Sequence, residues 1–183
     1  MQYFSPVIDL GEELWTPSFR LGCEYKALTP LASQVNLAYT ILYSGIFRVA
    51  WMGEESGILT VRKAHSDIDK QVFDRFLDAA KREPTITPGN SSFHLTKNRN
   101  ADILAWRKDK FLLNYSKKSY VPLNRYAKAY RSVDILPYMT IVTSHDLMFI
   151  DTMLPYNGSW AFDVLTVSTS VPDGFLEHLV GEY

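Results

Sequence analysis

The sequence predicts an α+β fold, in which a mixed or antiparallel sheet is combined with two main helices in the first half and a mostly β second half. Two stretches show helical apolar spacing, and most later apolar runs are short and β-rich. Strands and helices do not alternate regularly enough for a βαβ fold, and the helices exclude an all-β one. The length of 183 residues favours a single domain over 1–183.

The first 28 residues are predicted to form an irregular arm. Prolines and glycines interrupt their short apolar runs at Pro6, Gly11, Pro17 and Gly22. We expect residues 1–28 to be an arm, or a strand and loop, that packs on the domain or on a neighbouring molecule.

The first helix is predicted to begin at Thr29 and Pro30, because threonine is a good N-cap and proline suits the first helical position. Gly45 is predicted to close it as the glycine after the C-cap. Two β-rich runs, 46–52 and 58–64, then flank five residues that include two glycines. This pattern indicates a hairpin.

A second helix is predicted after Ser66 or Asp67, either of which suits the N-cap. Its apolar stripe consists of Ile68, Val72, Phe73, Phe76, Leu77 and Ala80. The acidic residues at the start of this helix and along it are interpreted as its N-cap and its solvent-exposed face. The helix must end before Pro84, and the loop 84–90 is the expected position of any joint between subdomains.

The second half is predicted to contain several strands and two short helices. The predicted strands are 92–96, 102–106, 111–115, 138–143, 147–153 and 160–168, with helices near 124–131 and 173–180 and a turn at 155–158. The charged stretches 97–100, 107–110 and 116–119 are predicted to be strand ends or hairpin tips that converge at one end of the sheet.

Charge is strongly segregated along the chain, although the net charge is only −1. Residues 97–131 contain 10 Lys or Arg and 2 Asp or Glu, whereas residues 132–183 contain 7 acidic residues and no Lys or Arg. The candidate partner-binding or nucleic-acid-binding residues of this basic block are Arg99, Arg107, Lys108, Lys110, Lys117, Lys118, Arg125, Lys128 and Arg131.

Three interpretations of the basic block stay open. The block can pack beside the acidic segment of its own fold, where exposed ion pairs contribute little to stability. It can bind nucleic acid, because lysine and arginine neutralise phosphates and the interleaved aromatic residues can stack on bases. It can also meet the acidic segment of another copy head to tail, as in a ring or filament.

No pattern of catalytic, metal-binding or phosphate-binding residues is present in the sequence. The four histidines are widely spaced, and Cys23 is the single cysteine, so no cysteine zinc site and no internal disulfide are possible. No Gly-rich phosphate loop occurs. We therefore predict no cofactor and no small-molecule ligand, although an enzyme site built from distant residues stays an open alternative.

The sequence favours a non-enzymatic interaction or assembly protein, with self-association or a protein partner. A structural subunit of a larger particle, such as a virus particle, would have this profile. Nucleic-acid binding through residues 97–131 is the alternative. We expect no secretory signal, no membrane span and a location in a reducing compartment, in the cytoplasm or within an assembled particle.

Overall fold

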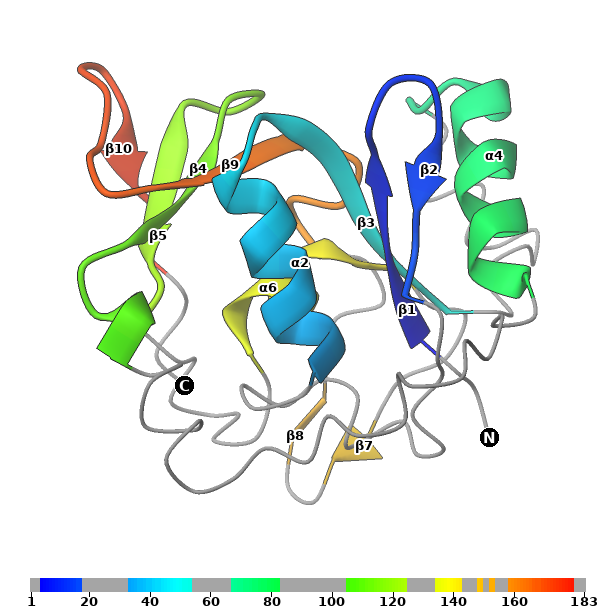
Figure 1. Ribbon diagram of the computed structural model, residues 1–183, viewed down its shortest axis with the longest axis horizontal. Helices are drawn as coiled ribbons and strands as arrows, with labels where there is room; N and C mark the ends of the chain where they lie inside the picture. The colour runs from blue at the N-terminus through cyan, green and yellow to red at the C-terminus, as the bar shows by residue number, and fades with distance from the viewer. Residues whose placement is uncertain are drawn as a thin grey trace.

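A mixed sheet with helices on both faces is the framework of the protein (Figure 1). The computed structural model describes residues 4–17, 33–53, 67–82, 105–124, 134–142, 148–149, 152–153 and 158–179. The predicted α+β class is confirmed, with two main helices before residue 83 and mostly strands in the described residues after it.

The sheet has the strand order β10-β5-β4-β9-β3-β1-β2, and β6 pairs with β3 off this path. Its strands are β1 (Phe4–Asp9), β2 (Leu14–Trp15), β3 (Phe47–Gly53), β4 (Phe111–Asn114), β5 (Ser119–Pro122), β6 (Ile141–Val142), β9 (Val164–Ser168) and β10 (Leu176–Glu177). The pairs β3–β6 and β5–β10 are parallel, and the other pairs are antiparallel. A separate ladder joins β7 (Met148–Phe149) to β8 (Thr152–Met153).

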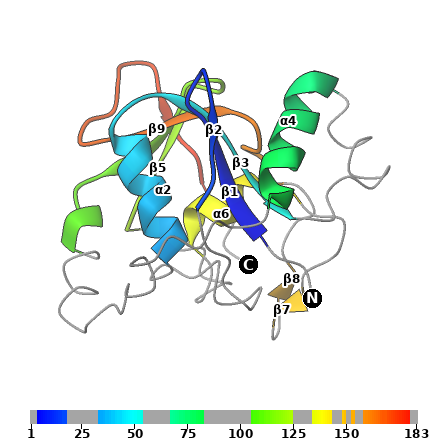
Figure 2. The same ribbon diagram turned by 45° about the vertical axis from the view of Figure 1, so that its right-hand side comes forward.

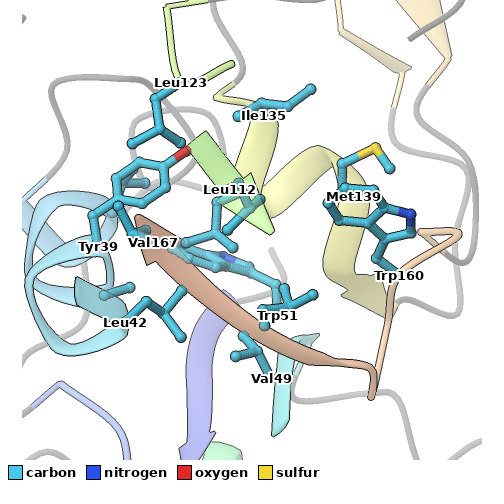
Figure 3. Close-up of a cluster of buried hydrophobic side chains, with 14 of the residues drawn as sticks. Tyr39, Leu42, Val49, Trp51, Leu112, Leu123, Ile135, Met139, Trp160 and Val167 are labelled. Carbon is cyan, nitrogen blue, oxygen red and sulfur yellow. The ribbon is translucent and has the colours of Figure 1, made fainter. Parts of the chain in front are cut away.

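Helices cover the two faces of the sheet and bury two hydrophobic clusters. Alternate residues of β3 supply both, because neighbouring side chains of a strand point to opposite faces. Val49 and Trp51 pack in the larger cluster, to which α2 (Ser33–Tyr43) and α6 (Ile135–Thr140) contribute (Figure 3). Ala50 and Met52 pack in the smaller cluster together with side chains of α4 (Lys70–Lys81). Figure 2 shows α4 and α2 on either side of β1.

The two predicted helices are present with changed ends. α2 includes 33–43, and the predicted start at Thr29 lies outside the described residues. Gly45 follows the helix without a positive φ, and a Cβ there would come within 2.7 Å of the outer edge of the Phe47 ring, so a larger residue would require that ring to shift. The N-cap of α4 is Asp69, not Ser66 or Asp67.

Residues 4–15 form a hairpin of the sheet, which agrees with the strand-and-loop alternative predicted for the N-terminal segment and corrects the expectation that it is irregular. β1 pairs with β3 over all six of its residues, from Phe4–Gly53 to Asp9–Arg48. Pro6 is tolerated because β2 pairs only with Ile8 and Asp9, and a proline is compatible with a strand that has one paired side. Gly11, with φ +99°, makes the turn that follows.

Several predictions for the second half are corrected. The predicted strand 138–143 is helical up to Thr140 and extended only at 141–142. Residues 105–107 are helical where a strand over 102–106 was predicted, and 147–153 contains the two strands β7 and β8 instead of one. The predicted helix 173–180 is a turn followed by β10, and β5 was missed.

Other predictions hold or lie outside the described residues. β4 and β9 fall within the predicted strands 111–115 and 160–168. The second hairpin strand 58–64, the loop 84–90, the strand 92–96, the turn residues 155–157 and the helix 124–131 beyond Asn124 lie outside the description.

Candidate functional site

The predicted binding residues occupy different environments. Arg99, Arg125, Lys128 and Arg131 lie outside the described residues. The described members are Arg107, Lys108, Lys110, Lys117 and Lys118. Lys108, Lys117 and Lys118 are exposed in turns, whereas Arg107 and Lys110 are buried.

Arg107 lies in the interior, with 1% of its side chain exposed. Its guanidinium forms an ion pair with the fully buried Asp134 and donates to Asn36 Oδ1 at 3.1 Å. The guanidinium carbon lies 4.6 Å from the centroid of the Tyr39 ring, and the Tyr39 hydroxyl donates to the same carboxylate. Arg107 is therefore not a surface-binding residue, because its fold-internal partners enclose it.

The cluster of Arg107, Asp134, Tyr39 and Asn36 joins α2, residues 105–107 and the start of α6. Asp134 also caps α6 by accepting from the Leu136 N–H at 3.1 Å. Burial, followed by the Asp134 carboxylate, raises the pKa of Tyr39 well above 10.0. The phenol therefore stays protonated and donates at neutral pH. Because the acid and base groups are sealed from solvent, we interpret the cluster as a structural crosslink.

Lys110 is also largely enclosed, with 9% of its side chain exposed. Its ammonium lies 4.5 Å from the centroid of the Trp106 ring and 5.7 Å from that of Tyr43. It donates to the Trp106 carbonyl at 2.8 Å and to Asp109 Oδ1 at 3.2 Å. These contacts hold Lys110 against its own fold, and they leave Lys108 as the exposed basic residue of this turn.

The side chain of Lys117 links the turn between β4 and β5 to the segment that precedes β9. Its ammonium forms an ion pair with Asp163 and donates to the Ser159 carbonyl at 2.8 Å. Asn114 Nδ2 donates to the same Asp163 oxygen at 2.7 Å. Lys118 is exposed beside this contact and has a φ of +49°.

The described charged turns do not converge at one end of the sheet, so that prediction is corrected. The stretch 107–110 precedes β4 and the stretch 115–118 follows it, which places them at opposite ends of the strand. Four extended residues span about 13 Å. Arg107 pairs with Asp134 and Lys117 with Asp163, so the basic block and the acidic segment neutralise each other at both positions.

An exposed apolar surface that the sequence analysis missed lies at the β10 end of the sheet. Leu176 and Leu179 are 75% and 78% exposed. Phe175 packs edge-to-face on the half-exposed Tyr115, with 5.2 Å between ring centroids. We use the name β10 edge surface for the described residues of and beside β10 that are exposed or partly exposed: Tyr115, Lys118, Asp173, Phe175, Leu176, Glu177 and Leu179. Leu176 and Leu179 are three positions apart along an extended segment, so their side chains point to opposite sides of it. The sequence analysis missed these exposed side chains because it predicted a helix over 173–180, and a helix would have turned the two leucines toward the core.

Backbone hydrogen bonds attach β10 to β5. The Leu176 N–H donates to the Lys118 carbonyl at 3.0 Å, and the His178 N–H donates to the Tyr120 carbonyl at 2.8 Å. The His178 ring lies 5.4 Å from that of the buried Trp160. Partial burial, together with the charge of Lys117, lowers the pKa of His178 below 6.5. β10 is thus held to the sheet by backbone hydrogen bonds, while the side chains of Leu176 and Leu179 stay exposed.

Comparisons with known proteins give no match, whether to a protein-family model, a curated protein or a solved structure. Among the described residues, no group of three or more His, Cys, Asp or Glu side chains is arranged to hold a metal ion. Within the same ranges, each helix is too short or too polar to cross a bilayer.

Proposed function

We propose that this protein is a non-enzymatic interaction protein that binds a protein partner through the β10 edge surface. The observation that carries the proposal is the exposure of Leu176 and Leu179, at 75% and 78%, beside the last strand of the sheet. Burying a leucine side chain contributes about 1.5–3 kcal/mol. Exposed apolar side chains gathered near a sheet edge, with charges around them, are a feature of many protein interaction sites.

The surroundings of the two leucines support this function. Tyr115 and Phe175 extend the apolar area, and aromatic side chains are enriched at interfaces. Lys118, Asp173 and Glu177 are also exposed in this part of the chain, and charges at an interface set orientation more than affinity. A structural subunit of a larger particle, a virus particle included, is one setting for such a contact.

Nucleic-acid binding receives less support from the described residues. Phosphate binding needs several cations along one track. Here Lys108 and Lys118 lie at opposite ends of β4, while Arg107 and Lys110 are enclosed. Nucleic-acid binding is therefore one of the results that the experiment described next can reveal.

Site-specific photo-crosslinking in the cells that naturally make the protein tests the proposal. A photoreactive amino acid at position 179 should give one protein adduct of defined mass, and the same probe at the exposed Asp78 of α4 serves as the control. Leu176→Asp should abolish the adduct, because it places a charge in the contact, whereas Ile46→Asp on another exposed apolar side chain should not. No protein adduct, or an adduct that nuclease removes, would overturn the proposal.

A further inference from the structure

Few backbone contacts join β10 to the sheet. β10 is two residues long, stands at one end of the strand order and pairs with β5 (Figure 1). The N–H groups of Leu176 and His178 donate to the carbonyls of Lys118 and Tyr120. The exposed residues of this segment are Asp173, Gly174, Leu176, Glu177 and Leu179. A segment that buries so little surface opens locally at a lower free energy than the whole fold.

Two ring contacts add to these hydrogen bonds. Phe175 packs edge-to-face on Tyr115, with 5.2 Å between ring centroids, but Tyr115 is itself 40% exposed. The His178 ring lies 5.4 Å from the ring of Trp160, which is only 1% exposed. Of these two contacts, the one made by His178 reaches the core, so a change at His178 acts directly on the attachment of β10.

The chain enters β10 through a turn with the properties of a hinge. The Phe175 N–H donates to the Pro172 carbonyl at 3.3 Å, and Gly174 has a φ of +84°. A Cβ at Gly174 would meet nothing within 4 Å, so the backbone conformation, and not packing, favours glycine there. An exposed glycine in this turn allows the change of backbone angles that moving β10 off the sheet requires.

His178 takes up a proton less readily when β10 is attached than when it is detached. Partial burial, followed by the charge of Lys117, lowers the pKa of His178 in the folded protein. Lys117 is itself paired with Asp163. Other titratable residues beside His178 in the described part of the chain are Glu177, Lys118 and Tyr120. In a detached segment the ring is in water, where neither burial nor Lys117 opposes the proton.

We infer that residues 175–179 form a strap that detaches from β5 as a local unit, hinged at Gly174, and that proton binding to His178 opens it. The direction follows from linkage: the detached form binds the proton more tightly, so the equilibrium shifts toward it as pH falls below 6.5. Every contact involved lies within one chain, so the inference does not depend on the proposed partner. Opening the strap frees the edge of β5 and uncovers the Trp160 ring.

Amide hydrogen exchange of the full chain, followed by NMR, tests the inference. The amides of Leu176 and His178 should have opening constants at least about a hundredfold larger than that of Leu113, which lies in β4 between two paired strands. Between pH 7.5 and pH 5.5 the opening constant of these two amides should rise by up to about tenfold. This is the limit for a histidine with a pKa of 6.5 in water that stays neutral when the strap is attached.

Matched variants separate the roles of the ring and the hinge. His178→Phe keeps a ring against Trp160 and does not titrate, so its strap opening should no longer vary with pH. Gly174→Ala should raise the opening constant about fivefold at both pH values, because opening relieves the strain of a side chain at positive φ. Gly11→Ala, which creates the same strain in the turn between β1 and β2, should leave strap opening unchanged.

Three results would each overturn the inference. Equal opening constants for Leu176 and Leu113 would show that β10 leaves the sheet only when the whole fold unfolds. A wild-type opening constant that is the same at both pH values, or a His178→Phe variant that keeps the wild-type pH ratio, would remove the role of His178. Equal effects of Gly174→Ala and Gly11→Ala would remove the hinge. None of these measurements involves a partner, so the proposed function is decided separately by its own crosslinking experiment.

Discussion

Asp134 is the residue at which three distant parts of the chain meet. It accepts from Arg107, from the Tyr39 hydroxyl and from the N–H of Leu136, and it is fully buried. Asp134→Asn should lower the free energy of unfolding by about 3–5 kcal/mol, because it leaves the charge of Arg107 buried without a carboxylate. Urea denaturation followed by circular dichroism measures this loss.

The control for Asp134 is Asp109, a carboxylate with 75% of its side chain exposed that pairs with Lys110. Asp109→Asn should change the free energy of unfolding by less than about 1 kcal/mol, since exposed ion pairs contribute little. Equal effects of the two substitutions would contradict the interpretation of the buried cluster as a structural crosslink.

His178 makes stability depend on pH. Its pKa in the folded protein lies below 6.5, because partial burial and Lys117 disfavour the charged ring. As pH falls below 6.5, the unfolded chain binds a proton that the folded chain does not yet accept. The free energy of unfolding should therefore decrease with falling pH between 6.5 and the lower folded pKa. Melting temperatures from pH 8 to pH 5 measure this slope.

Two substitutions separate His178 from the other histidines. His178→Gln should remove its part of the pH slope, because glutamine does not titrate. Lys117→Met should move the pKa of His178 upward, as followed by NMR titration of the ring, because it removes a neighbouring positive charge. An unchanged slope in His178→Gln would show that another group carries the pH dependence.

At the scale of elements, the start of α4 depends on one aspartate. The Asp69 carboxylate accepts from the N–H of Gln71 at 2.7 Å and from that of Val72 at 3.4 Å. Asp69→Ala should lower the free energy of unfolding by about 1 kcal/mol, because it leaves these donors without their cap. Asp67→Ala should have a much smaller effect, since Asp67 is exposed and precedes the cap. Thermal and urea unfolding of both variants compares the two positions.

Elements with long, regular patterns could be predicted, whereas short ones could not. The apolar stripe of α4 repeats over three turns, which fixes the helix type, while three nearby aspartate or serine residues compete to cap it. Residues 138–142 are apolar enough for either a helix or a strand. The cap at Asp134 and the first-turn position of Pro137 decide for a helix up to Thr140.

The β10 segment shows the same ambiguity with a consequence for function. The spacing of Leu176 and Leu179 suits a helix, but Gly174 adopts a φ of +84° and the chain then extends along β5. β10 is extended because it pairs with β5, more than fifty positions earlier in the sequence. A local sequence pattern does not predict such a pairing. The candidate site was therefore missed by sequence reasoning.

At the scale of the whole molecule, two contacts among the described residues join the basic block to the acidic segment. Arg107 pairs with Asp134, and Lys117 pairs with Asp163. For these described residues the interpretation of internal neutralisation holds. The candidate contact with a partner thus moves from the basic block to an apolar edge of the sheet.

The sequence by itself determined the α+β class, the two main helices and the inward face of α4, because these follow from side-chain periodicity within a few turns. Only the tertiary structure decided which lysines and arginines stay exposed and which apolar side chains remain outside. Tyr39 and Asp134 are 95 positions apart, and Arg107 and Asp134 are 27 apart. Burial at such separations depends on how the elements pack, and local spacing does not encode it.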